Sequence, residues 1–289
     1  MRKKIYNLMI ILLLLGGCGL AFYPAISNLW NQLQQNKVAD GYAEAVGGYS
    51  EEELEAMREK ARQYNEDLLK DEIIVDPFDQ VKAQKAGVEY YEAINPQGNG
   101  VMGLIRIPKI EVELPIYHGT GEEVLQKAIG HLEQTSLPIG GEGTHAVISG
   151  HRGLPRAELF SDLNLLEVGD EFYLEILGET LAYQVDQIKT VEPDQLEDLA
   201  IISGEDHVTL VTCTPYAINS HRLLVRGTRI PYAGETDQEV EAKEKAVKRL
   251  IFVIVVFAVV VALLILWRVR KKKQKRRGED RKSETRKKK

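Results

Sequence analysis

Cys213 is the residue of this sequence whose type and position are best suited to chemistry. It follows the β-like run His207–Thr212 and precedes Thr214-Pro215, where the chain must leave a strand, so its thiol is expected at a surface. A thiolate is the attacking form of cysteine, and nearby positive charge lowers a thiol pKa from about 8.5. A free cysteine taken alone is more often a small buried hydrophobe, so Cys213 needs partners before it can be interpreted as a nucleophile.

Two basic side chains are the predicted partners of Cys213. His151 lies in a glycine-flanked loop after a predicted strand, and Arg222 begins the next predicted strand after Cys213. Histidine can protonate a departing amine and then deprotonate an incoming nucleophile. Arginine stays charged and can stabilise a carbonyl or an oxyanion. Cys213, His151 and Arg222 together predict acyl transfer through an acyl-enzyme.

The other histidines are interpreted as structural hydrogen-bonding residues, because an arbitrary histidine is more often structural than catalytic. They are His118, His131, His145, His207 and His221. The sequence contains neither a metal-ligand cluster nor a glycine-rich phosphate loop. We therefore expect no metal and no cofactor.

Short β-like runs dominate the chain from Val101 onward and must position these side chains. The runs are Leu104–Ile107, Val112–Leu114, Ala146–Ser149, Phe172–Leu177, Leu181–Ile188, Val208–Thr212 and Leu223–Ile230. Short helices are predicted at Glu122–Ala128, Ala157–Leu163 and Pro193–Leu199. Many short strands with scattered helices predict a mainly β barrel or sandwich.

A longer helix is predicted ahead of the β region. Ser50 is a candidate N-cap with Glu53 as its capping-box partner, and an apolar stripe continues to about Leu69. The helix must end before Asp76-Pro77-Phe78, because a proline biases the preceding residue away from helical backbone.

Two apolar stretches explain how charge is distributed along the chain. The net charge of -6 combines basic ends with a strongly acidic middle, which argues against a nucleic-acid surface. An apolar run from Leu250 to Trp267 precedes a basic tail and can span a membrane. The stretch from Ile5 to about Ala25 is either a second span or a cleaved signal peptide. Basic flanks stay cytoplasmic, so we expect two spans, both termini inside and the acidic domain outside.

Leu15–Cys18 also matches a lipoprotein processing box, in which Cys18 would be lipidated. We favour a small-residue patch inside a membrane helix, because a second anchor makes lipidation redundant. The predicted organisation is an anchor or signal sequence at 1–26, a helical and lid segment at 27–100, a catalytic β-barrel at 101–235, a juxtamembrane linker at 236–249, a transmembrane helix at 250–267 and a basic cytoplasmic tail at 268–289.

The sequence around Cys213 resembles that of one known protein family. Thr209–Cys213 matches the TLxTC signature of sortases, and Thr214–Gly227 is similar to its continuation in the class C, pilus-specific branch. Further motifs of that family are Leu114–Gly119, Gly130–Pro138, Gly150–Gly153, Leu159-Phe160 and Tyr183–Ile188. The resemblance covers about residues 50–235, and Ala217 stands where this branch often has glycine.

The resemblance implies a fold, a reaction and partners. It implies an eight-stranded β-barrel with Cys213, His151 and Arg222 as the catalytic set. Such enzymes cut an LPxTG-like sorting signal after its threonine and hold that threonine as a thioester. In the pilus branch, a lysine amine of another pilin releases it as an isopeptide. The expected location is the membrane of a Gram-positive bacterium, with pilin subunits as partners, a peptidoglycan precursor as a further candidate, and no nucleic acid.

Asp76-Pro77-Phe78 resembles the lid motif of class C sortases. By that analogy Asp76 pairs with Arg222 while Phe78 covers Cys213 and closes the empty site. The alternative is an ordinary turn whose phenylalanine packs on the domain. We favour the lid, since loops over sites commonly gate access.

Three other functions remain open at this point. The protein could be a housekeeping sortase that attaches proteins to peptidoglycan, or a related cysteine hydrolase whose acyl-enzyme passes to water. It could also be a non-enzymatic receptor or adhesin ectodomain, in which case Cys213→Ala would leave function intact. The second apolar stretch, the long helix and the lid-like turn favour the pilus branch.

Overall fold

The computed structural model describes residues 2–68, 76, 78, 87–154, 157–234, 245, 248, 249, 252, 255 and 256. The chain divides into two compact units, Met1–Thr236 and Asp237–Lys289. In the second unit all the described residues are helical. The tail 268–289 and most of the predicted span 250–267 lie outside the described residues, and so does Pro77. No helix in the described parts of the chain combines the length and the apolar character needed to cross a membrane.

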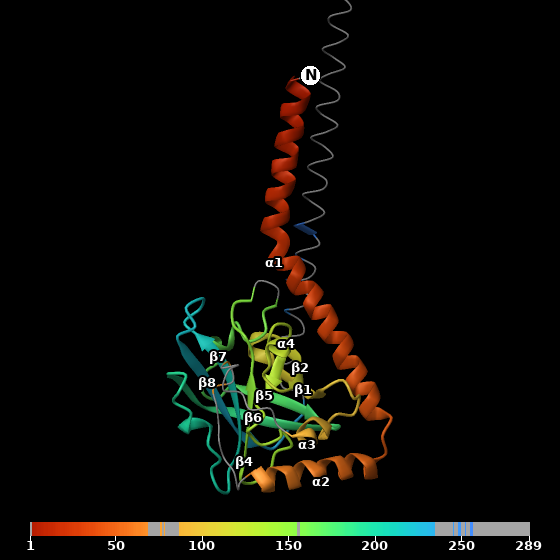
Figure 1. Ribbon diagram of the computed structural model, residues 1–289, viewed down its shortest axis with the longest axis vertical. Coiled ribbons are helices and arrows are strands. Elements are labelled where there is room, and N and C mark those ends of the chain that lie inside the picture. The colour runs from red at the N-terminus through yellow and green to blue at the C-terminus, as the bar shows by residue number, and fades with distance from the viewer. Residues whose placement is uncertain are drawn as a thin grey trace, which may run out of the picture. The chain divides into compact units, whose positions relative to one another are not determined.

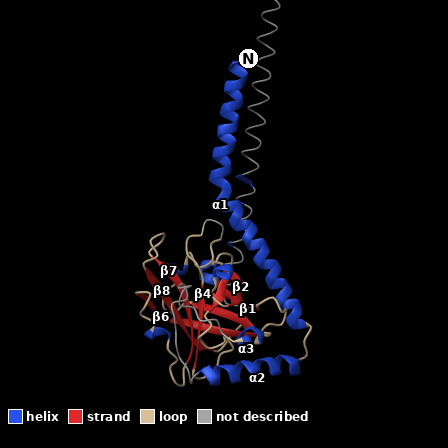
Figure 2. Ribbon diagram, viewed as in Figure 1, coloured by secondary structure: helices blue, strands red, loops and turns tan. Residues whose placement is uncertain are grey.

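The first unit is built around a closed barrel of eight strands in the order β1-β2-β3-β4-β7-β8-β6-β5. The strands are β1 Val101–Ile107, β2 Val112–His118, β3 Ile129–His131, β4 Thr144–Ser149, β5 Glu171–Ile176, β6 Glu179–Val191, β7 Asp206–Thr214 and β8 His221–Ile230. Two neighbouring pairs are parallel, β2 with β3 and β4 with β7, and the others are antiparallel. Figures 1 and 2 show the strands gathered in one body with the helices outside it. The prediction of a mainly β, eight-stranded barrel is confirmed.

Strand β7 is covered on both of its faces, which explains its nearly continuous apolar sequence. Val208 and Leu210 belong to the main core of the unit. Val211 points the other way, because successive side chains of a strand alternate between faces. It belongs to a second cluster with Leu132, Val147, Leu199 and Leu224, against which Phe78, Val191 and Leu196 pack. Cys213 lies two residues beyond Val211 and therefore shares its face.

The helices that precede the barrel are fixed to it by buried polar contacts. Helix α1 spans Arg2–Gly47 with Pro24 inside it, α2 spans Glu51–Leu68 and α3 spans Val88–Glu92. On α1, the Tyr42 hydroxyl donates to the Met102 carbonyl and accepts from the Leu177 amide. On α2, the Asn65 amide group exchanges two hydrogen bonds with the Leu137 backbone. These bonds leave few buried polar groups of the helices unpaired.

The capping box predicted at the start of α2 is confirmed. The Glu53 amide donates to the Ser50 hydroxyl at 3.3 Å, and the Ser50 amide donates to the Glu53 carboxylate at 2.8 Å. Both residues thus satisfy backbone N–H groups that a helix start leaves unpaired.

The short helices of the barrel region are predicted less well. Only α4, Glu122–Leu125, forms in the first predicted segment, and only the 3-10 helix η3, Glu197–Leu199, in the third. The helix predicted at Ala157–Leu163 is wrong: Leu159 has a φ of 40°, and the 3-10 helix η2 follows at Leu163–Leu165. Such short segments gain too few hydrogen bonds to offset helix nucleation, so turns replace them. Another 3-10 helix, η1, spans Pro108–Ile110.

Candidate active site

Cys213 and Arg222 lie directly opposite each other on neighbouring strands. Near the end of β7 and the start of β8, the two residues are partners in the antiparallel register. Opposite residues of an antiparallel pair project from the same face of the sheet, so the thiol and the guanidinium stem are neighbours. Cys213 is unpaired and 6% exposed, and Arg222 is 8% exposed. The short connection between the two strands thus brings sulfur and guanidinium onto one face, as the strand signals predict.

His151 leaves β4 beside the end of β7. The parallel pairing of these strands ends at Ser149 and Val211, and the Gly150 amide donates to the Val211 carbonyl at 3.0 Å. The Thr212 hydroxyl donates to the Gly150 carbonyl at 2.7 Å. The half-buried His151 therefore begins its loop next to the strand end that carries Cys213.

Asp76 forms a bidentate ion pair with Arg222. The Arg222 Nε donates to Oδ1 of Asp76 at 2.9 Å, and Nη2 donates to Oδ2 at 2.6 Å. The Arg222 Nη1 also donates to the carbonyls of Asn219 and His221, both at 3.2 Å. Both side chains of the ion pair are largely shielded from water, at 10% and 11% exposure. A paired fork of this kind is among the stronger and more directional protein contacts.

Phe78 contacts both basic side chains of the predicted catalytic set. Its ring centroid lies 5.4 Å from that of the His151 imidazole and 5.1 Å from Cζ of Arg222. Its amide donates to Oδ1 of Asp76 at 3.3 Å. The pairing of Asp76 with Arg222 that the family resemblance implies is therefore present, and the Phe78 ring contacts the imidazole of His151 at a tilt of 42°.

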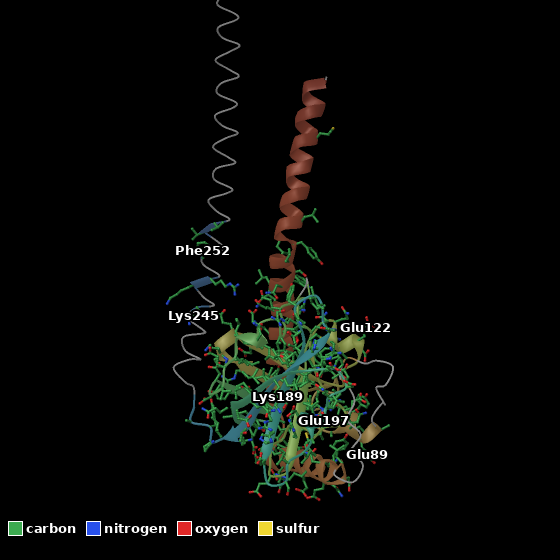
Figure 3. The ribbon with its side chains drawn as sticks, turned by 90° about the vertical axis from the view of Figure 1, so that its left-hand side faces the viewer. Glu89, Glu122, Lys189, Glu197, Lys245 and Phe252 are labelled. Atoms are coloured by element: carbon green, nitrogen blue, oxygen red, sulfur yellow. The ribbon has the colours of Figure 1, made fainter. Side chains whose placement is uncertain are left out.

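Burial is the largest influence on the pKa of Cys213 and on that of His151. It raises the pKa of the Cys213 thiol above its ordinary value, while Arg222 lowers it and Asp76 raises it. Burial also lowers the pKa of His151, against the opposing effect of the Glu122 carboxylate on α4 (Figure 3). At pH 7 these directions favour the neutral thiol and the neutral imidazole while Asp76 stays in place. Removal of the Asp76 charge favours the thiolate.

The histidines interpreted as structural lie in other surroundings. His118 and His131 face backbone carbonyls, and His145 bonds both the Ala200 carbonyl and the Thr209 hydroxyl. His207 is buried near Glu205, and His221 bonds Ser220. The described residues contain no group of three or more histidine, cysteine or acidic side chains placed to hold a metal ion.

Sequence reasoning does not single out Arg152, although it contacts the same region. Its guanidinium donates to the Thr214 hydroxyl and to the Asn164 side chain. The position directly after His151 is the only signal in the sequence that could have drawn attention to it.

Comparisons with known proteins agree on one family. Residues 105–230 match the sortase domain. The solved structure of Streptococcus agalactiae sortase C1 in complex with MTSET is 51% identical with a TM-score of 0.63, and the match covers 68% of this chain and 99% of that one. Streptococcus pneumoniae sortase C, whose structure bears on catalysis and pilin substrate specificity, is 48% identical with a TM-score of 0.62, covering 69% and 100%.

A curated relative is more distant in sequence. Sortase A of Streptococcus agalactiae serotype III is 26% identical over 223 residues, which are 74% of this chain and 83% of the relative. Three findings point to one conclusion: the match to the sortase domain, the closed eight-stranded barrel, and a sequence identity of about 50% to two streptococcal C-type sortases. The chain belongs to the sortase family, in its class C branch, and is a cysteine transpeptidase.

Proposed function

We propose that this transpeptidase assembles pili, with Cys213 as nucleophile, His151 as general acid and base, and Arg222 as the group that stabilises the oxyanion. The single observation that carries the proposal is the cross-strand pair Cys213–Arg222, next to which the His151 loop is tied by backbone and threonine bonds. The pilin substrate is carried over from the sortases C, one of which bears on pilin substrate specificity.

The first half of the reaction forms a thioester. His151 takes the thiol proton as the Cys213 sulfur attacks the threonine carbonyl of an LPxTG-like signal, and the bond between threonine and glycine then breaks. His151 gives its proton to the departing glycine amine, which leaves as a neutral amine. Arg222 lies opposite the sulfur and can face the carbonyl oxygen while it carries negative charge.

The second half transfers the acyl group to an amine. A lysine amine of a second pilin loses a proton to His151 and attacks the thioester. An amide forms between the threonine and that lysine, and the Cys213 thiolate is released. The amine that leaves in the first half and the amine that enters in the second make the reaction an exchange of one amide for another.

Asp76 and Phe78 form a lid over this site in our proposal. The guanidinium of Arg222 cannot meet a substrate oxygen on the side where the Asp76 carboxylate holds Nε and Nη2. Neither residue belongs to a barrel strand, so the lid can leave without breaking the sheet. Its departure also removes a negative charge that raises the pKa of Cys213.

We further propose that the enzyme works at the outer face of the bacterial membrane. The apolar runs in the sequence at 5–25 and 250–267, with their basic flanks, support this location. Pilins, themselves exported, would meet the barrel there.

Co-expression with a shaft pilin tests the proposal. A high-mass pilin ladder is expected with the unaltered enzyme, and none with Cys213→Ala. Purified enzyme and an LPxTG-like peptide, with and without a lysine-bearing pilin, then separate the alternatives by mass. Release of free peptide acid in both reactions would instead identify a hydrolase, and transfer only to a peptidoglycan precursor would identify a housekeeping sortase.

A further inference from the structure

Arg152 follows His151 directly, yet its side chain contacts three residues in two other segments. Its Nη1 donates to the Thr214 hydroxyl at 3.2 Å, and its Nη2 donates to Oδ1 of Asn164 at 2.7 Å. Its Cζ lies 6.0 Å from the ring centroid of Tyr216. These four residues, Arg152, Asn164, Thr214 and Tyr216, are called the Arg152 clasp below.

The clasp joins the neighbour of the imidazole to the neighbour of the sulfur. Thr214 follows Cys213 just as Arg152 follows His151. On the other side of both reacting residues, the Thr212 hydroxyl donates to the Gly150 carbonyl. The loop of His151 and the end of β7 are therefore connected both before and after the two residues that must exchange a proton.

A close backbone approach completes the clasp. Gly153 has a φ of 77°, and a Cβ at this position would lie 2.7 Å from Cε2 of Tyr216. Only glycine allows both the left-handed backbone and this contact. The ring of Tyr216 thus lies against the loop of His151, although Tyr216 is 59% exposed to solvent.

The geometry of the contacts explains why an arginine suits this position. A planar guanidinium can donate at once to two oxygens that belong to different segments, whereas the ammonium of lysine is a compact charge on a flexible stem. The two oxygens, of a hydroxyl and an amide, are uncharged. The charged groups that act on the Cys213 thiol are Arg222 and Asp76. Arg152 thus acts on its surroundings through shape and hydrogen bonds.

We propose that Arg152 is a positioning residue for acyl transfer. Its fork fixes the loop of His151 to the end of β7, so that the imidazole stays within proton-transfer reach of the sulfur and of the leaving amine. Misplacement of a reacting group by about 1 Å can lower a rate on the order of 100-fold. The inference rests on the proposed function of Cys213 and His151. It adds a residue that fixes their positions relative to each other.

Arg152→Lys tests this proposal, because it keeps the charge and loses the fork. We expect kcat for thioester formation with an LPxTG-like peptide to fall by about tenfold or more with KM little changed. The alkylation rate of Cys213 by a small thiol reagent, which does not need His151, should stay within about twofold. Arg62→Lys on the exposed face of α2 is the matched control and should alter neither rate.

A double-mutant cycle identifies the partner. Thr214→Val removes the hydroxyl that Arg152 bonds, and Arg152→Lys with Thr214→Val should be little slower than Arg152→Lys alone. Unchanged kcat in Arg152→Lys, additive effects in the cycle, or an equal loss of alkylation and acylation would each overturn the proposal. Cys213→Ala is measured in parallel: if it stays active, the proposed function fails, and if it is inactive while Arg152→Lys keeps the kcat of the unaltered enzyme, only the positioning role fails.

Discussion

His131 and His151 lie in two regions of the barrel that differ in how their polar groups are paired. His131 is fully buried on β3, with Nδ1 2.9 Å from the Tyr90 hydroxyl and Nε2 2.8 Å from the Ser136 carbonyl. The Tyr90 hydroxyl in turn accepts from the Gly119 amide at 2.9 Å. Each partner in this region is part of the folded framework, and none can leave without unfolding part of it.

The region around His151 has a different kind of partner. Its imidazole contacts the tilted ring of Phe78, and Arg222 is paired with Asp76. Both partners come from a segment that contributes no strand to the barrel. In the proposed mechanism, a substrate that replaces them must displace the two Asp76–Arg222 hydrogen bonds, the contacts of Phe78 with His151 and Arg222, and its packing on the apolar cluster around Val211. The comparison teaches that the two imidazoles differ both in burial and in whether their partners belong to the barrel framework.

The largest expected effect separates the two histidines by function. His151→Ala should lower transpeptidation by about 1000-fold or more, because both proton transfers lose their group, while the free energy of unfolding changes little. His131→Ala should do the reverse and destabilise by about 3 kcal/mol, since it leaves a cavity and unpaired Tyr90 and Ser136 oxygens. Peptide transfer assays and urea unfolding measure the two quantities. Similar stability losses in both variants would erase the distinction.

Acid should destabilise the protein through His131 and His145, the two histidines with the most strongly lowered pKa. Burial lowers the pKa of His131 to about 3 and that of His145 to about 4, from 6.5. Below pH 6.5 these two imidazoles bind protons in the unfolded chain but not in the folded protein. The free energy of unfolding therefore decreases as the pH falls from 6.5 toward 4. The loss attributable to His145 alone is about 3 kcal/mol at pH 4.

Urea midpoints at pH 7, 5.5 and 4 measure this loss. His145→Gln, which cannot take up a proton there, should flatten the dependence on pH. A pH dependence that is equally steep in His145→Gln would show that other groups dominate acid unfolding.

Local sequence signals predicted the parts of the site that local structure builds. The β-like runs on either side of Thr214-Pro215 predicted two neighbouring strands, and their pairing places Cys213 opposite Arg222. The three-residue strand β3 went unpredicted, because Ile129–His131 is too short to show alternation. The segment 157–163 has a helical apolar spacing, but it is too short to offset helix nucleation, and Leu159 has left-handed backbone instead.

Contacts between distant segments could not be predicted in this way. Asp76 and Arg222 are separated by 146 residues, and only the family resemblance suggested that they meet. Arg152 meets Thr214 across 62 residues, and no motif drew attention to that pair. Spacing along the chain carries no information on such contacts until strand order is known. The catalytic roles of Cys213, His151 and Arg222 stay predictions that the assays above address.

Removal of the Phe78 ring or of the Asp76 charge should raise the reactivity of the Cys213 thiol. Phe78→Ala should speed alkylation of Cys213 by up to about tenfold at pH 7, because the cover over the site is lost. Asp76→Asn should shift the pH midpoint of alkylation downward, since the carboxylate raises the pKa of Cys213 and offsets Arg222. Asp194→Asn, at an exposed position of the β6–β7 connection, is the matched control. An unchanged rate in Phe78→Ala would argue against a lid.

The smallest expected effect concerns backbone strain in the loop that joins Cys213 to Arg222. Glycine supplies left-handed backbone both near His131, at Gly119, and after His151, at Gly153, each with a φ of 77°. The loop that joins Cys213 to Arg222 instead has Ala217 at 64° and Asn219 at 59°. Alanine resists this conformation by about 1 kcal/mol, whereas asparagine tolerates it better.

Substituting glycine at Ala217 and Asn219, and alanine at Gly119, tests whether the loop between Cys213 and Arg222 stores backbone strain. Ala217→Gly should raise the free energy of unfolding by up to about 1 kcal/mol, and Asn219→Gly by less, because its side chain already accepts the left-handed backbone. Gly119→Ala should lower it, since the added Cβ would lie 3.0 Å from a Glu133 carboxylate oxygen on a strained backbone. Urea unfolding of the three variants gives the order directly. Destabilisation by Ala217→Gly would mean that the entropy that glycine adds to the unfolded chain outweighs the strain relieved in the folded loop. The two regions would then differ in the burial and the partners of their histidines alone.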